Sequence, residues 1–349
     1  MSIADVVRRQ KDIAQGRLTR IKDLPSHAIY SICNLRGGIG KTTLTVNLAY
    51  AAKEILVTDT CPQGNTSAFF DSNHYTNNAV TILDALMPYL IPGLGRATRI
   101  ALNVGATNPS YGKKHNVFYI PSNEQLYLLP NQISSALTQA ISIANASQRT
   151  IAITSILNSL KAEVVREMKE LKISKSLIDT SPFFSGATHL SWHAADALII
   201  PVRTDQQSIN SLNMLLKLLS DPAGEFQKYC RYGQGLSVPK IQMVVITHCG
   251  WSTVSGAQNE PNAPTKIYLE KVYDIVRKNI QHFTTDDPRN HVFALDDLLG
   301  SGRFSSATSR PIETLETGES VYINRVKVTV NNAVEKCKKQ LKFLNNCLW

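Results

Sequence analysis

The sequence LRGGIGKTT (residues 35–43) lies between an apolar run, AIYSIC at 28–33, and a helical pattern over 42–53. The apolar run predicts a buried strand. Glycines after such a strand let main-chain N–H groups turn toward an anion, and the next helix presents its positive dipole end to the same point. The segment therefore predicts a phosphate-binding loop, formed by Gly37, Gly38, Ile39, Gly40, Lys41, Thr42 and Thr43.

The spacing within this loop selects a variant of the motif. The common pattern GxxxxGK[ST] does not fit, because its first glycine would fall on Leu35, whereas the deviant form KGGxGK[ST] fits with Arg36 in place of its first lysine. In such a loop Lys41 reaches the β- and γ-phosphates, and the hydroxyl of Thr42 ligates Mg²⁺. We therefore expect a magnesium nucleoside triphosphate to bind here.

The rest of the chain alternates short apolar runs with helical patterns. This alternation implies βαβ units and a mostly parallel, twisted sheet with helices on both faces. We expect a single α/β P-loop NTPase domain over 26–349, a short basic helical extension over 1–25, and an irregular insertion at about 90–115. Further strands are predicted at 55–59, 117–120, 176–180, 197–202 and 241–247, and further helices at 155–172 and 207–219.

An acid follows the buried run SLI at the end of the strand predicted over 176–180. A carboxylate at the tip of a parallel strand beside a phosphate loop is well placed to hold Mg²⁺, directly or through a water. Alone, such an aspartate can equally cap the next helix. Because the phosphate loop is present, we favour Asp179 as a metal ligand together with Thr42.

The net charge of +10 favours polyanionic partners such as nucleic acid or an anionic membrane, although an ordinary basic protein has the same balance. The six cysteines are scattered and form no CxxC pair, which suggests a reducing cytosol rather than a disulfide framework. The N-terminal segment lacks the apolar stretch of a secretory signal, and no run approaches the ~20 apolar residues of a membrane span. A cytoplasmic location is expected.

Taken together, the motifs resemble the ParA/MinD family of deviant-Walker ATPases, and ParA-type partition ATPases most closely. The family's D-x-D-P-Q-G-N motif corresponds to DTCPQGN at 59–65, and its I-D-x-P-P motif to IDTSP at 178–182. The phrase YIPSNEQL at 119–126 is also similar, and the resemblance runs from about 28 to 345. It implies that ATP is the nucleotide, that Asp59 faces it, and that Pro201 and Val202 contact it.

The resemblance also implies a biological role and a set of partners. ParA-type ATPases form an ATP-dependent homodimer, bind DNA without sequence preference, and are stimulated to hydrolyse ATP by a ParB-like partner protein. They act in plasmid or chromosome partition, or in cargo positioning, and associate with the nucleoid when they hold ATP. Membrane association is not expected for this type.

The sequence departs from the family at two positions. Arg36 replaces a lysine that crosses the dimer interface in the family, and arginine keeps the charge with a different geometry. Cys61 replaces the aspartate that positions the attacking water, and a thiol accepts hydrogen bonds weakly. We therefore expect slow hydrolysis, unless another carboxylate substitutes. A nucleotide-gated interaction module with little hydrolysis remains an alternative function.

A basic amphipathic helix is predicted over about 330–347, and three interpretations of it compete. Its lysines form a solvated face, or they bind DNA phosphates as the ParA resemblance suggests, or the helix lies on an anionic membrane as in MinD-like positioning ATPases. The first two are compatible, and we favour them together. The apolar stripe is Val330, Val334, Cys337, Leu341, Leu344 and Leu348, and the candidate DNA-binding residues are Arg325, Lys327, Lys336, Lys338, Lys339 and Lys342.

Overall fold

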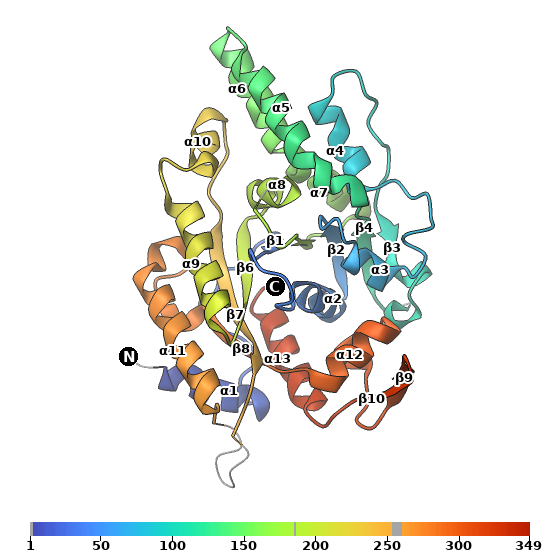
Figure 1. Cartoon of the computed structure of the whole chain (residues 1–349), viewed down its shortest axis with the longest axis vertical. Coiled ribbons are helices and arrows are strands. Elements are labelled where there is room, and N and C mark those ends of the chain that lie inside the picture. Colours follow the sequence, from blue (N-terminus) through green and yellow to red (C-terminus); the bar gives the residue numbers. More distant parts are fainter. Residues whose placement is uncertain (1–2, 113, 185, 253–259) are drawn as a thin grey trace.

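The computed structural model describes residues 3–112, 114–184, 186–252 and 260–349. At its centre is an eight-stranded sheet in the order β3-β4-β2-β5-β1-β6-β7-β8, parallel throughout except for the pairing of β3 with β4 (Figure 1). The expected α/β P-loop fold is confirmed. The strands are β1 (Ile29–Ile32), β2 (Glu54–Asp59), β3 (Leu102–Asn103), β4 (Asn116–Ile120), β5 (Ser176–Asp179), β6 (Ala197–Arg203), β7 (Lys240–Cys249) and β8 (Val292–Asp296).

Helices cover both faces of this sheet (Figure 1). Successive side chains of a strand point to opposite faces, so β6 places Ala197 and Ile199 in one core and Leu198 and Ile200 in the other. The first core includes α2 and α13, and the opposite face is covered by α4 to α8 at one end and by α9 and α11 at the other. The helices are α1 (Ala4–Ala14), α2 (Lys41–Ala52), α3 (Asn65–Phe70), α4 (Ile82–Leu90), α5 (Leu129–Ile141), α6 (Ala146–Leu157), α7 (Ser159–Leu171), α8 (Ala187–Ala194), α9 (Gln206–Ser220), α10 (Glu225–Tyr232), α11 (Ala263–Lys278), α12 (Leu299–Thr308) and α13 (Val334–Asn346).

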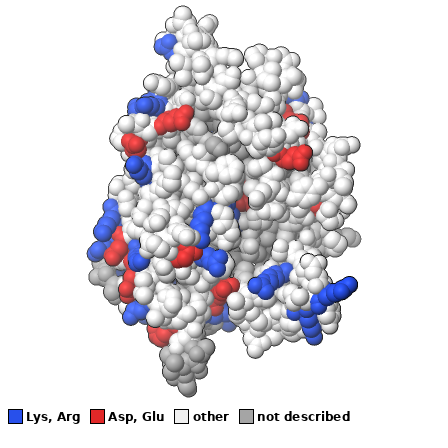
Figure 2. All heavy atoms as spheres, viewed as in Figure 1, with Lys and Arg blue, Asp and Glu red and all other residues white. Residues whose placement is uncertain are grey.

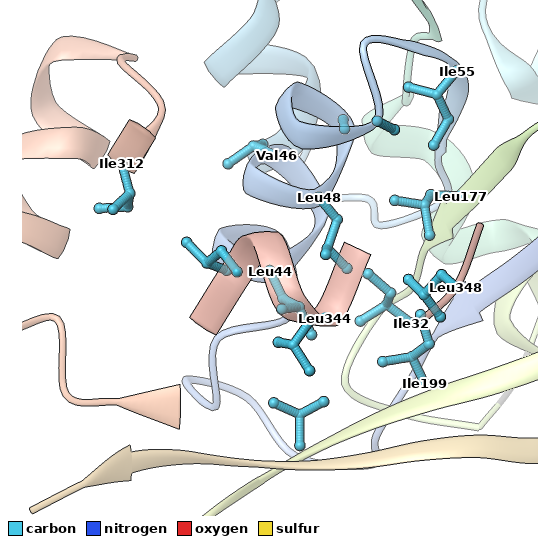
Figure 3. Close-up of a cluster of buried hydrophobic side chains, with 14 of the residues drawn as sticks. Ile32, Leu44, Val46, Leu48, Ile55, Leu177, Ile199, Ile312, Leu344 and Leu348 are labelled. Atoms are coloured by element: carbon cyan, nitrogen blue, oxygen red, sulfur yellow. The ribbon is translucent and has the colours of Figure 1, made fainter. Parts of the chain in front are cut away.

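The last helix, α13, is part of the core. Every member of the predicted apolar stripe from Val330 to Leu348 is buried. Figure 3 shows Leu344 and Leu348 among the side chains of Leu48 and Ile199, in the cluster that also holds Tyr30 and Ile32 of β1. Burying one leucine contributes about 1.5–3 kcal/mol, so this stripe fixes the helix to the sheet. Within the described residues, no helix has both the length and the hydropathy to cross a bilayer.

Two helix predictions were wrong in extent. The pattern over 155–172 is not one helix, because α6 ends at Leu157 and α7 begins at Ser159, with Asn158 between them. The break lets α6 pack beside α5 while α7 packs against α8, and the α5–α6 pair projects from the sheet (Figure 1). The N-terminal helix ends at Ala14, since Gly16 then takes a left-handed conformation with φ of 72°.

Other parts of the chain were predicted only in outline or not at all. The insertion at 90–115 is irregular along most of its described length, but it supplies the short edge strand β3 and buries Tyr111 completely. Strand β8 was not predicted, and neither was the separate hairpin of β9 (Ser320–Ile323) and β10 (Val326–Thr329). The N-terminal helix α1 packs against α13 and β8, with Val6 and Ile13 buried.

Candidate nucleotide site

The phosphate-binding loop joins the end of β1 to the start of α2. Gly38 and Gly40 have φ of 68° and 90°, the left-handed region in which side chains are strained. Gly40 is also the N-cap of α2, so the helix begins directly at Lys41. Main-chain N–H groups at a helix N-terminus form a ready anion site. The backbone of this loop therefore has the features that an anion site requires.

Lys41 is only 8% exposed. Its Nζ donates to the carbonyl oxygen of Arg36 at 2.9 Å and to that of Asn34 at 3.4 Å, so the ammonium group is held over the loop. Burial lowers the pKa of Lys41, and the nearby carboxylate of Asp179 opposes that shift. A phosphate in the loop would supply the anionic partner that a buried ammonium needs.

Asp179 lies at the end of β5 and is 1% exposed. Its Oδ2 accepts hydrogen bonds from the hydroxyls of Thr42, at 2.9 Å, and Thr66, at 2.5 Å. Its Oδ1 is buried and has no hydrogen-bond partner among the residues that the structure describes. An unpartnered carboxylate oxygen next to a threonine hydroxyl fits Mg²⁺, which prefers oxygen ligands and retains several waters. Thr42 and Asp179 are the residues that would hold the ion.

Asp59 stands beside Asp179 in the register of β2 and β5. It is fully buried, and its two oxygens accept from the main-chain N–H of Cys61 and from both the N–H and the hydroxyl of Ser67. Burial and the adjacent carboxylate of Asp179 raise the pKa of Asp59. This side chain therefore braces the loop after β2, and a bound cation would favour its charged form.

A cavity of about 210 Å³ opens at the phosphate loop. Residues that follow β2 and β5 complete its lining. Cys61 is 7% exposed there, and burial together with Asp59 raises the pKa of its thiol to about 12. The lining residues are Gly37 to Thr43, Cys61, Gln63, Asn65, Thr180 and Pro182. The structure thus brings the segments LRGGIGKTT (35–43), DTCPQGN (59–65) and IDTSP (178–182) together around one cavity.

Part of the chain matches a model of a known protein family. A family model described as an AAA domain (AAA_31) matches residues 27–228, more than half of the chain. The chain belongs to this AAA domain family. The match covers the phosphate loop, Asp59, Asp179 and the strands that carry them.

Individual relatives of this AAA domain are distant. The uncharacterized protein MJECL24 of Methanocaldococcus jannaschii is 24% identical over 200 residues, which are 55% of this chain and 65% of the relative's length. An ATP complex of a Cyanothece McdA variant is 19% identical with a TM-score of 0.56, covering 91% of this chain and 96% of that one. A putative plasmid partition protein of Borrelia burgdorferi B31 bound to AMPPNP is 15% identical with a TM-score of 0.53, covering 91% and 98%. These structures share the fold.

In this AAA domain, Arg36 is engaged within its own chain. It forms an ion pair with Asp205, the N-cap of α9, and its Nη1 donates to the hydroxyl of Ser208 at 2.7 Å. Burial raises the pKa of Asp205, but the N–H of Ser208 and the guanidinium of Arg36 outweigh it and lower the pKa overall. Arg36 could contact a phosphate of a second copy, as the family resemblance implies for this position, only after leaving this pair.

A second cavity, of about 490 Å³, adjoins the phosphate loop at Gly38, Gly40 and Thr43. It extends between the ends of β7 and β8 and the start of α12, where a nucleoside attached to bound phosphates would fit. The sequence did not predict this cavity. The polar residues at the ends of the buried strands β7 and β8 are the sequence feature that could have indicated it. The additional lining residues include Thr247, His248, Asp297, Gly302 and Arg303.

Pro201 and Val202 lie inside β6 rather than in either cavity. Val202 is fully buried in the core beneath α9. The carbonyl oxygen of Pro201 accepts from Nδ2 of Asn34 at 2.7 Å, at the start of the phosphate loop. Through this bond Pro201 supports the start of the phosphate loop, whereas Val202 packs in the core.

The candidate DNA-binding lysines of α13 are mostly engaged with neighbouring groups. Lys336 pairs with Asp296 at 3.1 Å and lies over the ring of Trp251 at 3.5 Å, so it is a packing residue in this structure. Lys338 pairs with Glu335 at 2.8 Å, and Lys339 donates to the carbonyl oxygen of Ala14. Lys342 is exposed.

Arg325 and Lys327 are exposed on the β9–β10 hairpin. Figure 2 shows Lys and Arg side chains on the part of the surface where Figure 1 places α12 and this hairpin. Tyr322, also on the hairpin, is 71% exposed. Among the candidate DNA-binding residues, Arg325, Lys327 and Lys342 are therefore the most accessible to a polyanion.

Proposed function

We propose that this AAA domain is a ParA-like ATPase that binds ATP with Mg²⁺, dimerises on ATP, and partitions DNA or positions cargo by binding DNA without sequence preference. The observation that carries the proposal is that Lys41 and Thr42 line one cavity, with Asp179 hydrogen-bonded to Thr42 and Asp59 beside Asp179 in the sheet. The bound ion supplies charge neutralisation at the phosphates. Lys41 and the loop amides bind and orient the triphosphate.

Structural neighbours support the nucleotide assignment. The Cyanothece McdA variant was solved with ATP, and the Borrelia partition protein with AMPPNP. Both chains align with most of this one, although the low identity limits the likeness to the fold.

Two exposed aromatic side chains support the proposed dimer. Phe183 is 47% exposed and follows Pro182 at the cavity, and Tyr75 is 65% exposed and contacts Gln63. Such a surface suits coverage by a second copy.

Nucleotide binding is the first test. Purified protein should bind ATP in a magnesium-dependent manner in isothermal titration calorimetry, and Lys41→Ala should abolish measurable binding. Lys169→Ala, an exposed lysine on α7, is the matched control and should bind as the wild type does. If neither the wild type nor the control binds any adenine nucleotide, the proposed function is wrong.

DNA binding is the second test. Fluorescence anisotropy with duplexes of unrelated sequence should show binding that requires ATP and weakens with salt. Each phosphate contact contributes about one unit to the slope of log affinity against log salt, so removing Arg325 and Lys327 together should lower that slope by about two units. Equal affinity and slope for this double variant would exclude the hairpin as the DNA surface.

Two alternative functions, a MinD-like membrane ATPase and a nucleotide-gated interaction module, predict different results in binding and hydrolysis assays. A MinD-like ATPase would bind anionic vesicles with ATP, but the buried stripe of α13 leaves no free apolar face for that role, and deleting residues 335–349 would remove core side chains. Vesicle binding must therefore be measured with the full chain. A nucleotide-gated interaction module would dimerise on ATP without turnover, with or without DNA and a ParB-like partner.

A further inference from the structure

The lining of the 210 Å³ cavity contains no carboxylate among the described residues. The thiol of Cys61 has a raised pKa and stays protonated near neutral pH, so it accepts hydrogen bonds poorly. Asp59 is fully buried, and both of its carboxylate oxygens already accept hydrogen bonds from Cys61 and Ser67. The protein must orient an attacking water with some other group.

Side-chain amides are the remaining polar groups that this loop contributes to the cavity. Gln63 and Asn65 both line it, and both are exposed. Asn65 donates from Nδ2 to Oε1 of Gln63 at 3.4 Å. An amide oxygen has two lone pairs, so Oε1 of Gln63 retains one for a water hydrogen, while its NH₂ group can donate to a phosphate oxygen or to the water.

The backbone of this loop is fixed from outside. The hydroxyl of Tyr75 donates to the carbonyl oxygen of Gln63 at 2.6 Å. Gly64 has φ of 60°, and a Cβ there would lie 2.8 Å from Nε2 of His74. Because the Tyr75 hydrogen bond holds residue 63, and the space beside His74 admits only glycine at residue 64, the amide of Gln63 starts from a defined main-chain position. Such pre-organisation is what a water-positioning group needs.

We propose that Gln63 is a catalytic residue that orients the attacking water, with Asn65 as a positioning residue that steadies the Gln63 amide. This inference rests on the proposed ATPase function. The water oxygen bonds to the γ-phosphorus, the bond from that phosphorus to the β–γ bridging oxygen breaks, and its electron pair stays on ADP. One hydrogen of the water stays on the new phosphate as a hydroxyl, and the other leaves as a proton to solvent. Gln63 orients the water and does not take the proton.

The experiment compares Gln63→Ala with Gln139→Ala, a matched control on the exposed face of α5. Three quantities are measured: ATP affinity by calorimetry, single-turnover hydrolysis, and the affinity for ADP with aluminium fluoride, a mimic of the transferring phosphoryl group. We expect Gln63→Ala to keep ATP affinity within about twofold, and to lose about 30-fold or more in both hydrolysis and ADP–aluminium fluoride affinity. The control should change none of them.

A second comparison separates positioning from a structural effect. In a Cys61→Asp background a carboxylate again faces the water, so Gln63→Ala should lose less activity than it does in the wild type. Equal ADP–aluminium fluoride affinity for wild type and Gln63→Ala would overturn the inference, whether or not hydrolysis is detectable. Loss of ATP binding by the wild type would instead overturn the proposed function.

Discussion

Arg36, next to the glycines of the phosphate loop, forms an ion pair with Asp205, the residue that caps α9 in the same chain. The two side chains are 27% and 31% exposed, so the pair lies at the surface beside the loop. A partly exposed pair of this kind stabilises the fold only modestly. Its larger consequence concerns the proposed dimer, in which Arg36 could not hold Asp205 and a phosphate on the second copy at once.

Releasing Arg36 should therefore favour the dimer. Asp205→Asn keeps a good N-cap for the N–H of Ser208 but removes the charge. We expect ATP-dependent dimerisation, measured by analytical ultracentrifugation, to tighten several-fold, while the free energy of unfolding falls by less than about 1 kcal/mol. Asp274→Asn, which breaks an exposed pair with Arg277 on α11, is the control. Weaker dimerisation of Asp205→Asn would show that the pair supports the interface.

Removing the charge of Asp179 should separate metal binding from stability. Asn in its place still accepts from the hydroxyls of Thr42 and Thr66. Burial raises the pKa of Asp179, which means that its charged form is unfavourable without a cation. Asp179→Asn should thus unfold at equal or higher denaturant concentration without nucleotide, yet lose at least tenfold in magnesium-dependent ATP affinity. A variant that loses stability and keeps its magnesium dependence would contradict the assignment.

Restoring a carboxylate at position 61 should speed hydrolysis. The buried thiol of Cys61 cannot act as a base near neutral pH, whereas an aspartate there could accept a hydrogen bond from the attacking water. We expect Cys61→Asp to raise the turnover number at least tenfold in a phosphate-release assay, and Cys61→Ser to leave it nearly unchanged. Wild-type turnover equal to that of Cys61→Asp would show that the thiol is no handicap.

A buried histidine pair should make the fold sensitive to acid. His189 and His193 lie on α8 with their Nε2 atoms 3.2 Å apart, and burial lowers the pKa of His189 to about 4 and that of His193 well below its usual range. Both histidines stay neutral in the folded protein. In the unfolded chain their pKa returns to about 6.5, so each takes up a proton below that pH. Stability is thus present above pH 6.5 and lost as the pH falls toward 4.

His189→Phe removes one of these groups while keeping a ring against Phe184 and Phe226. We expect the fall in unfolding free energy between pH 7 and pH 4.5 to be about 2 kcal/mol smaller in this variant than in the wild type, measured by urea unfolding. Parallel curves for the two proteins would mean that other groups cause the acid sensitivity.

The predicted strands over 28–33, 55–59 and 176–180 correspond to β1, β2 and β5, whose short apolar runs are bounded by loops. The phosphate loop could also be recognised from the sequence, because Gly38 and Gly40 take left-handed conformations that other residues avoid, which makes glycine the residue expected there. The helix over 155–172 was wrong, since the apolar pattern continues through Asn158 and only the packing of α6 against α5 reveals the break. Strand β8 and the β9–β10 hairpin depend on neighbours distant in the chain.

The sequence by itself determined the phosphate loop, its neighbouring strands and the presence of Asp59, Cys61 and Asp179, because local spacing and side-chain chemistry are enough to define them. Only the tertiary structure decided what each side chain contacts. It tied Arg36 to Asp205, placed Lys336 against Asp296, and brought Gln63 to a cavity without a carboxylate among the described residues that line it. These relationships join residues far apart in the chain, and they form only when the sheet aligns its carboxyl ends and the helices pack around it.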